Sequence, residues 1–306
     1  MKPRLLVLSL LALPLLACVA APAAWAATPI NQTRQLDPRG KIEIENIKGR
    51  IQVRVWDKPE VRISGSLGAG VEKLVVEGDR RDLLVRVQYP KRTGGGWSDS
   101  KAEPTDLRLD VPRFAELEIE SVSANVDVVG TAASTLEVDS VSGDVVVAGA
   151  PRQAAIESVS GDLRITLNSP DVHVESVSGD ITLRGRLSGE VHTESVSGDI
   201  SIDNNRLSLR RLATATVSGD ANVHVGLMNG GSIKSESVSG EINLVLPKSL
   251  SARVMGESFS GDLNAPGAEI HKPKYGPGSS FEHRYGNGSG DIRIESFSGD
   301  VDLKLE

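Results

Sequence analysis

The sequence predicts an all-β protein, folded as a parallel β-solenoid of short two-strand coils with an N-terminal β region that caps it. Three observations predict this fold. The motif Glu-Ser-Val-Ser-Gly-Asp recurs along the chain, most copies are 18 to 21 residues apart, and apolar and polar residues alternate on both sides of each copy. A short period that tolerates small insertions is typical of a solenoid, in which each coil contacts only its neighbours.

The chain begins with a segment typical of export signals. Two basic residues precede the apolar run over residues 5–19, and Ala24-Trp25-Ala26 supplies a small-x-small cleavage pattern. We predict a signal peptide over residues 1–26 and no transmembrane segment after its cleavage. The residues before Cys18 resemble a lipobox, so a lipoprotein is the less favoured alternative. Both interpretations predict an exported protein, in the periplasm or on the cell surface.

Residues 27–112 are expected to form the N-terminal β region that starts the solenoid. Alternation is clear over residues 41–45, 51–55 and 83–87, and residues 46–50 resemble a degenerate copy of the repeat corner. Glycines and scattered charges without periodicity predict a mobile loop over residues 91–106. Residues 107–112 then lead into the repeats of residues 113–306.

Each repeat is expected to place two strands on either side of a Ser-Gly-Asp corner. Residues two and four after the glycine are apolar, as are those seven and five before it in most repeats, which is the period of a strand with one buried face. We expect the glycine to supply a positive φ, Ser and Asp to bond to nearby amides, and the Val or Phe two before the glycine to fill the core. The predicted corner glycines are Gly143, Gly161, Gly179, Gly198, Gly219, Gly240, Gly261, Gly290 and Gly299.

An inserted loop is predicted over residues 264–288, where proline and glycine are frequent and the spacing between glycines rises to 29. Ligand contacts favour loops carried by a rigid scaffold. The candidate ligand residues of this loop are His271, Tyr275, Phe281, His283 and Tyr285. A disordered excursion or a cover for the end of the stack is the alternative.

Two columns of acidic residues follow from the repeat, one four residues before each glycine and one directly after it. Like charges at strand spacing repel each other, and Ca²⁺ would relieve that repulsion. Solvated carboxylates that prevent edge pairing are the favoured interpretation. His173 and His192 should stack in adjacent coils, but the column supplies no third ligand beyond the flanking glutamates, so no metal site and no cofactor are predicted.

The composition excludes several classes of function. The net charge is −7, and loss of Lys2 and Arg4 with the signal peptide makes it −9, which disfavours nucleic acid as a partner. Cys18 is the only cysteine, so the exported chain would have no disulfide. The nucleophile elbow of hydrolases is absent, and no catalytic residues are predicted.

The chain resembles a bacterial family of exported adhesin-like proteins with β-strand repeats, a domain of unknown function. The resemblance covers residues 40–306 and rests on the Ser-Val-Ser-Gly-Asp-apolar-x-apolar unit, on Gly49-Arg50-Ile51-Gln52-Val53 and on Leu107-Arg108-Leu109-Asp110-Val111-Pro112. Ala124 and Ala215 depart from the repeat columns. The resemblance implies an architecture and transfers no catalytic residue.

We therefore expect a non-catalytic protein of the envelope or cell surface that binds or scaffolds, with an unknown envelope protein or glycan as its partner. A periplasmic partner in envelope-stress sensing and a polysaccharide-active enzyme are the alternatives. Exposed end coils also suggest an edge-to-edge homodimer.

Overall fold

The computed structural model describes residues 27–90 and 102–306. The predicted signal peptide, the lipobox alternative at Cys18 and most of the predicted loop over 91–106 lie outside the described residues. Thr105 and Asp106, expected in that loop, are the first residues of strand β6. No described residue is in a helix, so the described chain offers no helix that could cross a membrane.

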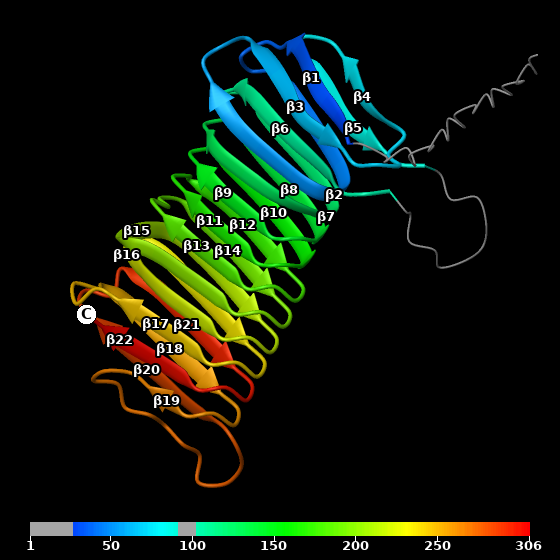
Figure 1. Cartoon of the computed structure of the whole chain (residues 1–306). Helices are drawn as coiled ribbons and strands as arrows, with labels where there is room; N and C mark the ends of the chain where they lie inside the picture. The colour runs from blue at the N-terminus through cyan, green and yellow to red at the C-terminus, as the bar shows by residue number, and fades with distance from the viewer. Residues whose placement is uncertain (1–26, 91–101) are drawn as a thin grey trace, which may run out of the picture.

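The described chain is a β-solenoid whose strands stack as rungs of a long ladder with two faces (Figure 1). The first face consists, in spatial order, of β4 (Lys73–Gly78), β5 (Asp82–Gln88), the first half of β2 (Lys41–Trp56), the first half of β7 (Glu116–Thr131), β8 (Thr135–Ser142), β10 (Gln153–Ser160), β12 (Asp171–Ser176), β14 (Glu190–Ser195), the second half of β15 (Ile200–Thr216), the second half of β16 (Ala221–Ser237), β21 (Gly290–Ser296), β18 (Ala252–Ser258) and β20 (Ser279–Tyr285).

The second face repeats this order on the other side of the corner. It consists of β1 (Thr28–Gln35), β3 (Glu60–Leu67), β6 (Thr105–Pro112), the second halves of β2 and β7, β9 (Val145–Gly149), β11 (Leu163–Leu167), β13 (Ile181–Gly185), the first halves of β15 and β16, β17 (Ile242–Leu246), β22 (Val301–Leu305) and β19 (Leu263–Asn264).

The core lies between the two faces and follows the predicted alternation. Val138, Ile156 and Val174 are fully buried in successive rungs of the first face, and Leu163 and Ile181 are fully buried on the second. Parallel pairing keeps identical columns in register, so each apolar side chain stacks on its counterpart in the next rung. The expected period-two pattern is therefore confirmed.

The corner glycines are required for a different reason from the one expected. Only Gly143 and Gly161 have φ in the left-handed range, at +139° and +115°. A Cβ on Gly198 would lie 2.1 Å from the carbonyl oxygen of Gly179, and one on Gly240 would lie 1.8 Å from that of Gly219. Glycine is needed because the backbones of successive coils approach closely at this corner. Ala124 stands in place of the corner glycine in the continuous strand β7.

The Val of the motif does not fill the core, and this expectation was wrong. Val159, Val177 and Val196 are 46 to 49% exposed, whereas the preceding Ser158, Ser176 and Ser195 are buried. The alternation simply continues through the motif, so Glu and Val point outward and the serine between them points inward. The buried serine is satisfied locally: Ser195 Oγ accepts a hydrogen bond from the Gly198 amide at 2.9 Å.

Both ends of the ladder depart from sequence order. The last coil of the chain, β21 with β22, lies between the coil of β16 and β17 and the coil of β18 and β19. At the other end, β5 and β6 lie outside β2. Antiparallel strands cover these outer coils, with β20 on β18, β4 on β5, and β3 and β1 on β6.

Two sequence predictions fail because of this arrangement. Gly290 is not a corner glycine, since it begins β21 opposite Ala252, far from Gly261. The segment 264–288 is not entirely a loop, since residues 279–285 form the capping strand β20.

Candidate functional site

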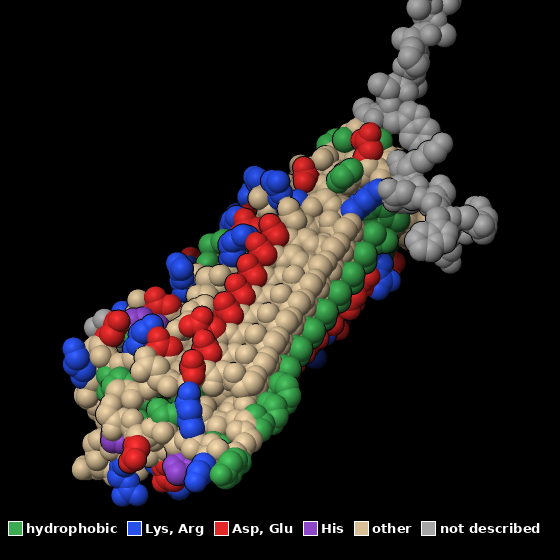
Figure 2. Space-filling view, turned by 90° about the horizontal axis from the view of Figure 1, so that it is seen from below, with side chains coloured by type: hydrophobic (Ala, Val, Ile, Leu, Met, Phe, Trp, Pro, Cys, Tyr) green, Lys and Arg blue, Asp and Glu red, His purple; other side chains and the backbone are tan. Residues whose placement is uncertain are grey.

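A groove runs along the first face, with a volume of about 1480 Å³. Figure 2 shows it as an acidic row and an apolar row on either side of a flat polar strip. The acidic row is Glu45, Glu120, Asp139, Glu157, Glu175, Glu194, Glu236, Glu295 and Glu257, interrupted by Ala215. The apolar row is Ile47, Val122, Val141, Val159, Val177, Val196, Val217, Val238, Phe297 and Phe259.

The apolar row is continuous and unusually exposed for its composition. Its members are 44 to 57% exposed in every coil from β2 to β18. The rings of Phe259 and Phe297 stack with centroids 4.8 Å apart and planes 5° apart, which extends the row to the end of the ladder. Contiguous exposed apolar surface of this kind marks a binding surface.

The acidic row differs along its length in what neutralises it. Towards the C-terminal end, Lys234 contacts Glu236 at 2.7 Å and Arg293 pairs with Glu295. In the coils of β7, β8 and β10, the residues two before the acids are Glu118, Glu137 and Ala155, so cations are missing from these positions. Arg86 pairs with Glu45 in the coil of β2, so the negative charge is most concentrated in the coils of β7, β8 and β10.

The pKa of Asp139 is raised in this part of the acidic row. Burial raises the pKa of its carboxyl group to about 6, and the charges of Glu157, Glu137, Glu120 and Glu118 raise it in the same direction. A carboxyl group with a raised pKa that faces a groove is a candidate for contact with a cationic ligand, which would favour its ionised form.

The second acidic column, directly after the corner glycines, has a structural role. The Asp199 amide donates to Asp180 Oδ1 at 3.0 Å, and the Asp220 amide donates to Asp199 Oδ1 at 2.8 Å. The second serine of the motif also bonds across coils, since Ser197 Oγ donates to the Val177 carbonyl at 3.1 Å. These bonds connect successive corners and account for the motif without any reaction.

The predicted ligand residues of the segment 264–288 are dispersed. Phe281 is buried over Gly256, and the His283 ring meets the Tyr285 ring edge-on with centroids 4.5 Å apart. Tyr275 is 85% exposed. Only His271 lines the groove, where Pro273, Pro277 and residues 278–280 close its C-terminal end.

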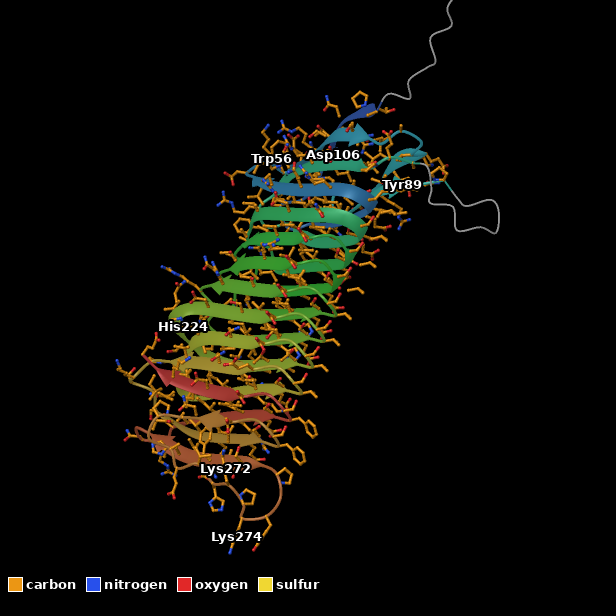
Figure 3. All side chains as sticks on the ribbon, turned by 60° about the horizontal axis from the view of Figure 1, so that its bottom comes forward. Trp56, Tyr89, Asp106, His224, Lys272 and Lys274 are labelled. Atoms are coloured by element: carbon orange, nitrogen blue, oxygen red, sulfur yellow. The ribbon has the colours of Figure 1, made fainter. Side chains whose placement is uncertain are left out.

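The same segment carries basic residues at the end of the ladder (Figure 3). Lys272 Nζ lies 3.1 Å from Asp262 Oδ1, and Lys274 stands over the Tyr275 ring. The segment therefore covers the end coil, which was the alternative interpretation from the sequence, and contributes one end of the groove.

His173 and His192 stack as expected, with ring centroids 4.7 Å apart and planes 4° apart. The structure adds that each imidazole contacts the glutamate two residues further on, His173 Nε2 to Glu175 Oε1 at 2.7 Å and His192 Nε2 to Glu194 Oε1 at 2.9 Å.

The groove itself was not predicted, although the sequence contained the signal for it. Ile156, Glu157, Ser158 and Val159 alternate in, out, in and out, so extending the strand parity through the motif would have placed Glu and Val on one outward surface. The outward surface was missed because the Val or Phe of the motif was expected to point into the core.

These features define a class: a β-solenoid repeat protein with antiparallel strand caps, displaced end coils and a groove along one face. The chain belongs to the Toastrack DUF4097 family, a domain of unknown function, whose model matches residues 39–188 and 168–304. The resemblance seen in the sequence is thereby confirmed. No curated protein matches the chain.

Solved structures resemble the chain at low identity. A "putative adhesin" of Bacteroides fragilis shares 13% identity with a TM-score of 0.42, covering 91% of this chain and 98% of that one. A "putative lipid binding protein" of Parabacteroides distasonis shares 14% identity with a TM-score of 0.42, covering 91% and 97%. A "putative cell adhesion protein" of Clostridium sporogenes shares 13% with a TM-score of 0.27, covering 91% and 100%.

Proposed function

We propose that the protein is a non-catalytic, exported module of the cell envelope that binds an extended partner chain along the groove. The observation that carries the proposal is the uninterrupted apolar row beside an acidic row over the length of the ladder. A partner that fits both rows is an unfolded or extended polypeptide with apolar side chains on one edge and Lys or Arg on the other. Its charges would relieve the repulsion within the acidic row.

A second copy of this chain fits the groove less well. The apolar row has the acidic row on one side and the Asp column of the corners on the other, so two such rows placed together would also bring acids together. Edge-to-edge pairing stays a separate prediction, and it would use the capping strands β1, β4 and β20 rather than bare coils.

The alternative of a polysaccharide-active enzyme finds no support in the groove. Glycoside hydrolysis uses two carboxyl groups on opposite sides of the scissile bond. Among the described residues that line the groove, the acids stand along one wall and the facing wall is Val, Ile and Phe.

The experiment measures binding of two fluorescent peptides of equal length, one alternating Lys and Leu, the other alternating Glu and Leu. We expect the Lys-Leu peptide to bind and its affinity to fall as salt is raised. The double variant Val177→Lys with Val196→Lys should weaken binding at least tenfold. The matched control is Val146→Lys, since Val146 is a comparably exposed valine, at 38%, on the second face.

Equal binding of the two peptides, or equal losses in the groove variant and the control, would contradict the proposal. Location is tested separately by protease digestion of intact and permeabilised cells. Digestion in intact cells favours an adhesin-like surface role, and protection until permeabilisation favours the periplasmic alternative, a partner in envelope-stress sensing.

A further inference from the structure

We infer that His173, His192 and Glu175 form a binding site for a transition-metal ion of the Zn²⁺ type, with Glu194 as the fourth ligand. The four residues come from two adjacent strands, β12 and β14, in which His173 pairs with His192 and Glu175 with Glu194. Two imidazoles and carboxylates are a ligand set that suits zinc, because zinc accepts both nitrogen and oxygen ligands.

The geometry brings three of the four ligand atoms together. One atom each of His173, Glu175 and His192 lies within 4.8 Å of the others. Tetrahedral zinc with bonds of about 2.1 Å holds its ligand atoms about 3.4 Å apart. The two rings, 4.7 Å apart at their centroids, would tilt together, and each His-Glu contact of 2.7 or 2.9 Å would open slightly.

The side chains have the freedom to make these adjustments. The His173 and His192 side chains are 39% and 37% exposed, and those of Glu175 and Glu194 are 43% and 50% exposed. The rungs on either side place Ala155 and Ala213 next to the histidines. These small residues leave the pair open to solvent, so an ion can reach it.

The pairing within each coil also orients the ligands. Each imidazole presents Nε2 to a carboxylate oxygen, so the ligand atoms of His173, His192 and Glu175 already lie close together, and Glu194 would reach the ion from its contact with His192. The two glutamates belong at the same time to the acidic row of the groove, and a bound ion would neutralise that part of the row.

The test is calorimetric titration of the exported chain, made without a polyhistidine tag, with ZnCl₂ and separately with CaCl₂. We expect one zinc per chain, at least tenfold weaker binding in His173→Gln and in His192→Gln, and weaker binding in Glu175→Gln. The matched control is His224→Gln, since His224 lies in β16, outside the proposed site, with the Asp203 carboxylate 3.9 Å away, and is labelled in Figure 3.

A second readout is pH. Because protons compete with zinc for the imidazole nitrogens, zinc affinity should fall as the pH is lowered. Absence of zinc binding, zinc binding that survives both histidine substitutions, or Ca²⁺ binding of equal strength would overturn the inference. The last two outcomes would assign the cation to the acidic row alone.

Discussion

At the scale of single residues, the repeated motif is a set of backbone connections rather than a reactive site. In ESVSGD the first Ser bonds to the Gly amide, the second Ser bonds to the preceding coil, and the Asp receives the amide of the next coil. The Glu and the Val are left for the outer surface. Within the motif, the Ser, Gly and Asp residues therefore hold the coils together, while the Glu and Val residues form the outer surface.

Gly198→Ala should destabilise the protein by about 3 kcal/mol, near the upper end for overpacking. The added Cβ would lie 2.1 Å from the Gly179 carbonyl oxygen, and backbone cannot move aside cheaply. Gly230→Ala is the matched control, since Gly230 has φ of +73° but nothing within 4 Å of an added Cβ. It should cost only the backbone strain, about 1 kcal/mol. Urea unfolding measures both, and equal losses would contradict the close-approach explanation.

Thr214→Val should stabilise the protein by about 1 kcal/mol. Thr193, Thr214 and Ser235 occupy one core column in three successive rungs, and their hydroxyl oxygens are buried without a hydrogen-bond partner among the described residues. Valine has the same shape without the unsatisfied group. Thr182→Val, on the partly exposed side of β13, is the control and should change little. A lower melting temperature for Thr214→Val would show that the hydroxyl group has a partner.

At the scale of elements, the sequence predicts the strands of the repeated coils, but it does not predict arrangements that occur only once in the chain. The strands around Gly161, Gly179 and Gly198 follow directly from the alternation, and the register of residues 46–50 with 121–125 confirms the degenerate corner. The placement of β21 and β22 could not be predicted, because parity and spacing fit any rung equally well. Gly290-Asp291-Ile292 also resembles a corner locally, and only its pairing with Ala252 shows otherwise.

Deletion of residues 290–306 should unfold the C-terminal end while leaving the central coils intact. It removes β21 and β22, which hold β18 and β19 against the stack through parallel pairing. Hydrogen exchange should show loss of amide protection over β18 and β20 and continued protection of β10 and β12. Deletion of residues 248–306 also removes β18, β19 and β20. Amide protection of the central coils in the two deletions is then compared. Protection of β18 in the shorter deletion would mean that it can pair directly with β16.

At the scale of the whole molecule, stacking of the coils places the acidic side chains in one row along the ladder. Parallel register places an acid at the same position in almost every coil, so each carboxylate lies between like charges. Burial raises the pKa of the Asp139 carboxyl group to about 6, and the acids in the coils on both sides of it raise it in the same direction. The ladder therefore carries an electrostatic cost that no single coil would have, and a cationic partner in the groove would remove it.

This cost predicts how stability changes with pH. Asp139 has a raised pKa in the folded state, from 3.8 to about 6, so the folded protein binds more protons than the unfolded chain between these values. Unfolding free energy attributable to Asp139 should then fall as the pH rises from about 4 to about 6, and stay low above it. Asp139→Asn, which cannot ionise, should match the wild type near pH 4 and exceed it at pH 7.

The difference between the two proteins is the quantity to measure, because other groups change stability in both directions. Arg86 lowers the pKa of Glu45, while the hydrogen bond that Glu43 donates to Glu45 raises the pKa of Glu43. Subtracting thermal unfolding curves of Asp139→Asn from those of the wild type at each pH removes these shared contributions. Asp106→Asn, at an exposed position of β6, controls for the loss of one negative charge. A difference that is constant with pH would show that the acids of neighbouring coils do not act on Asp139, and the groove would then hold no stored repulsion for a cationic chain to relieve.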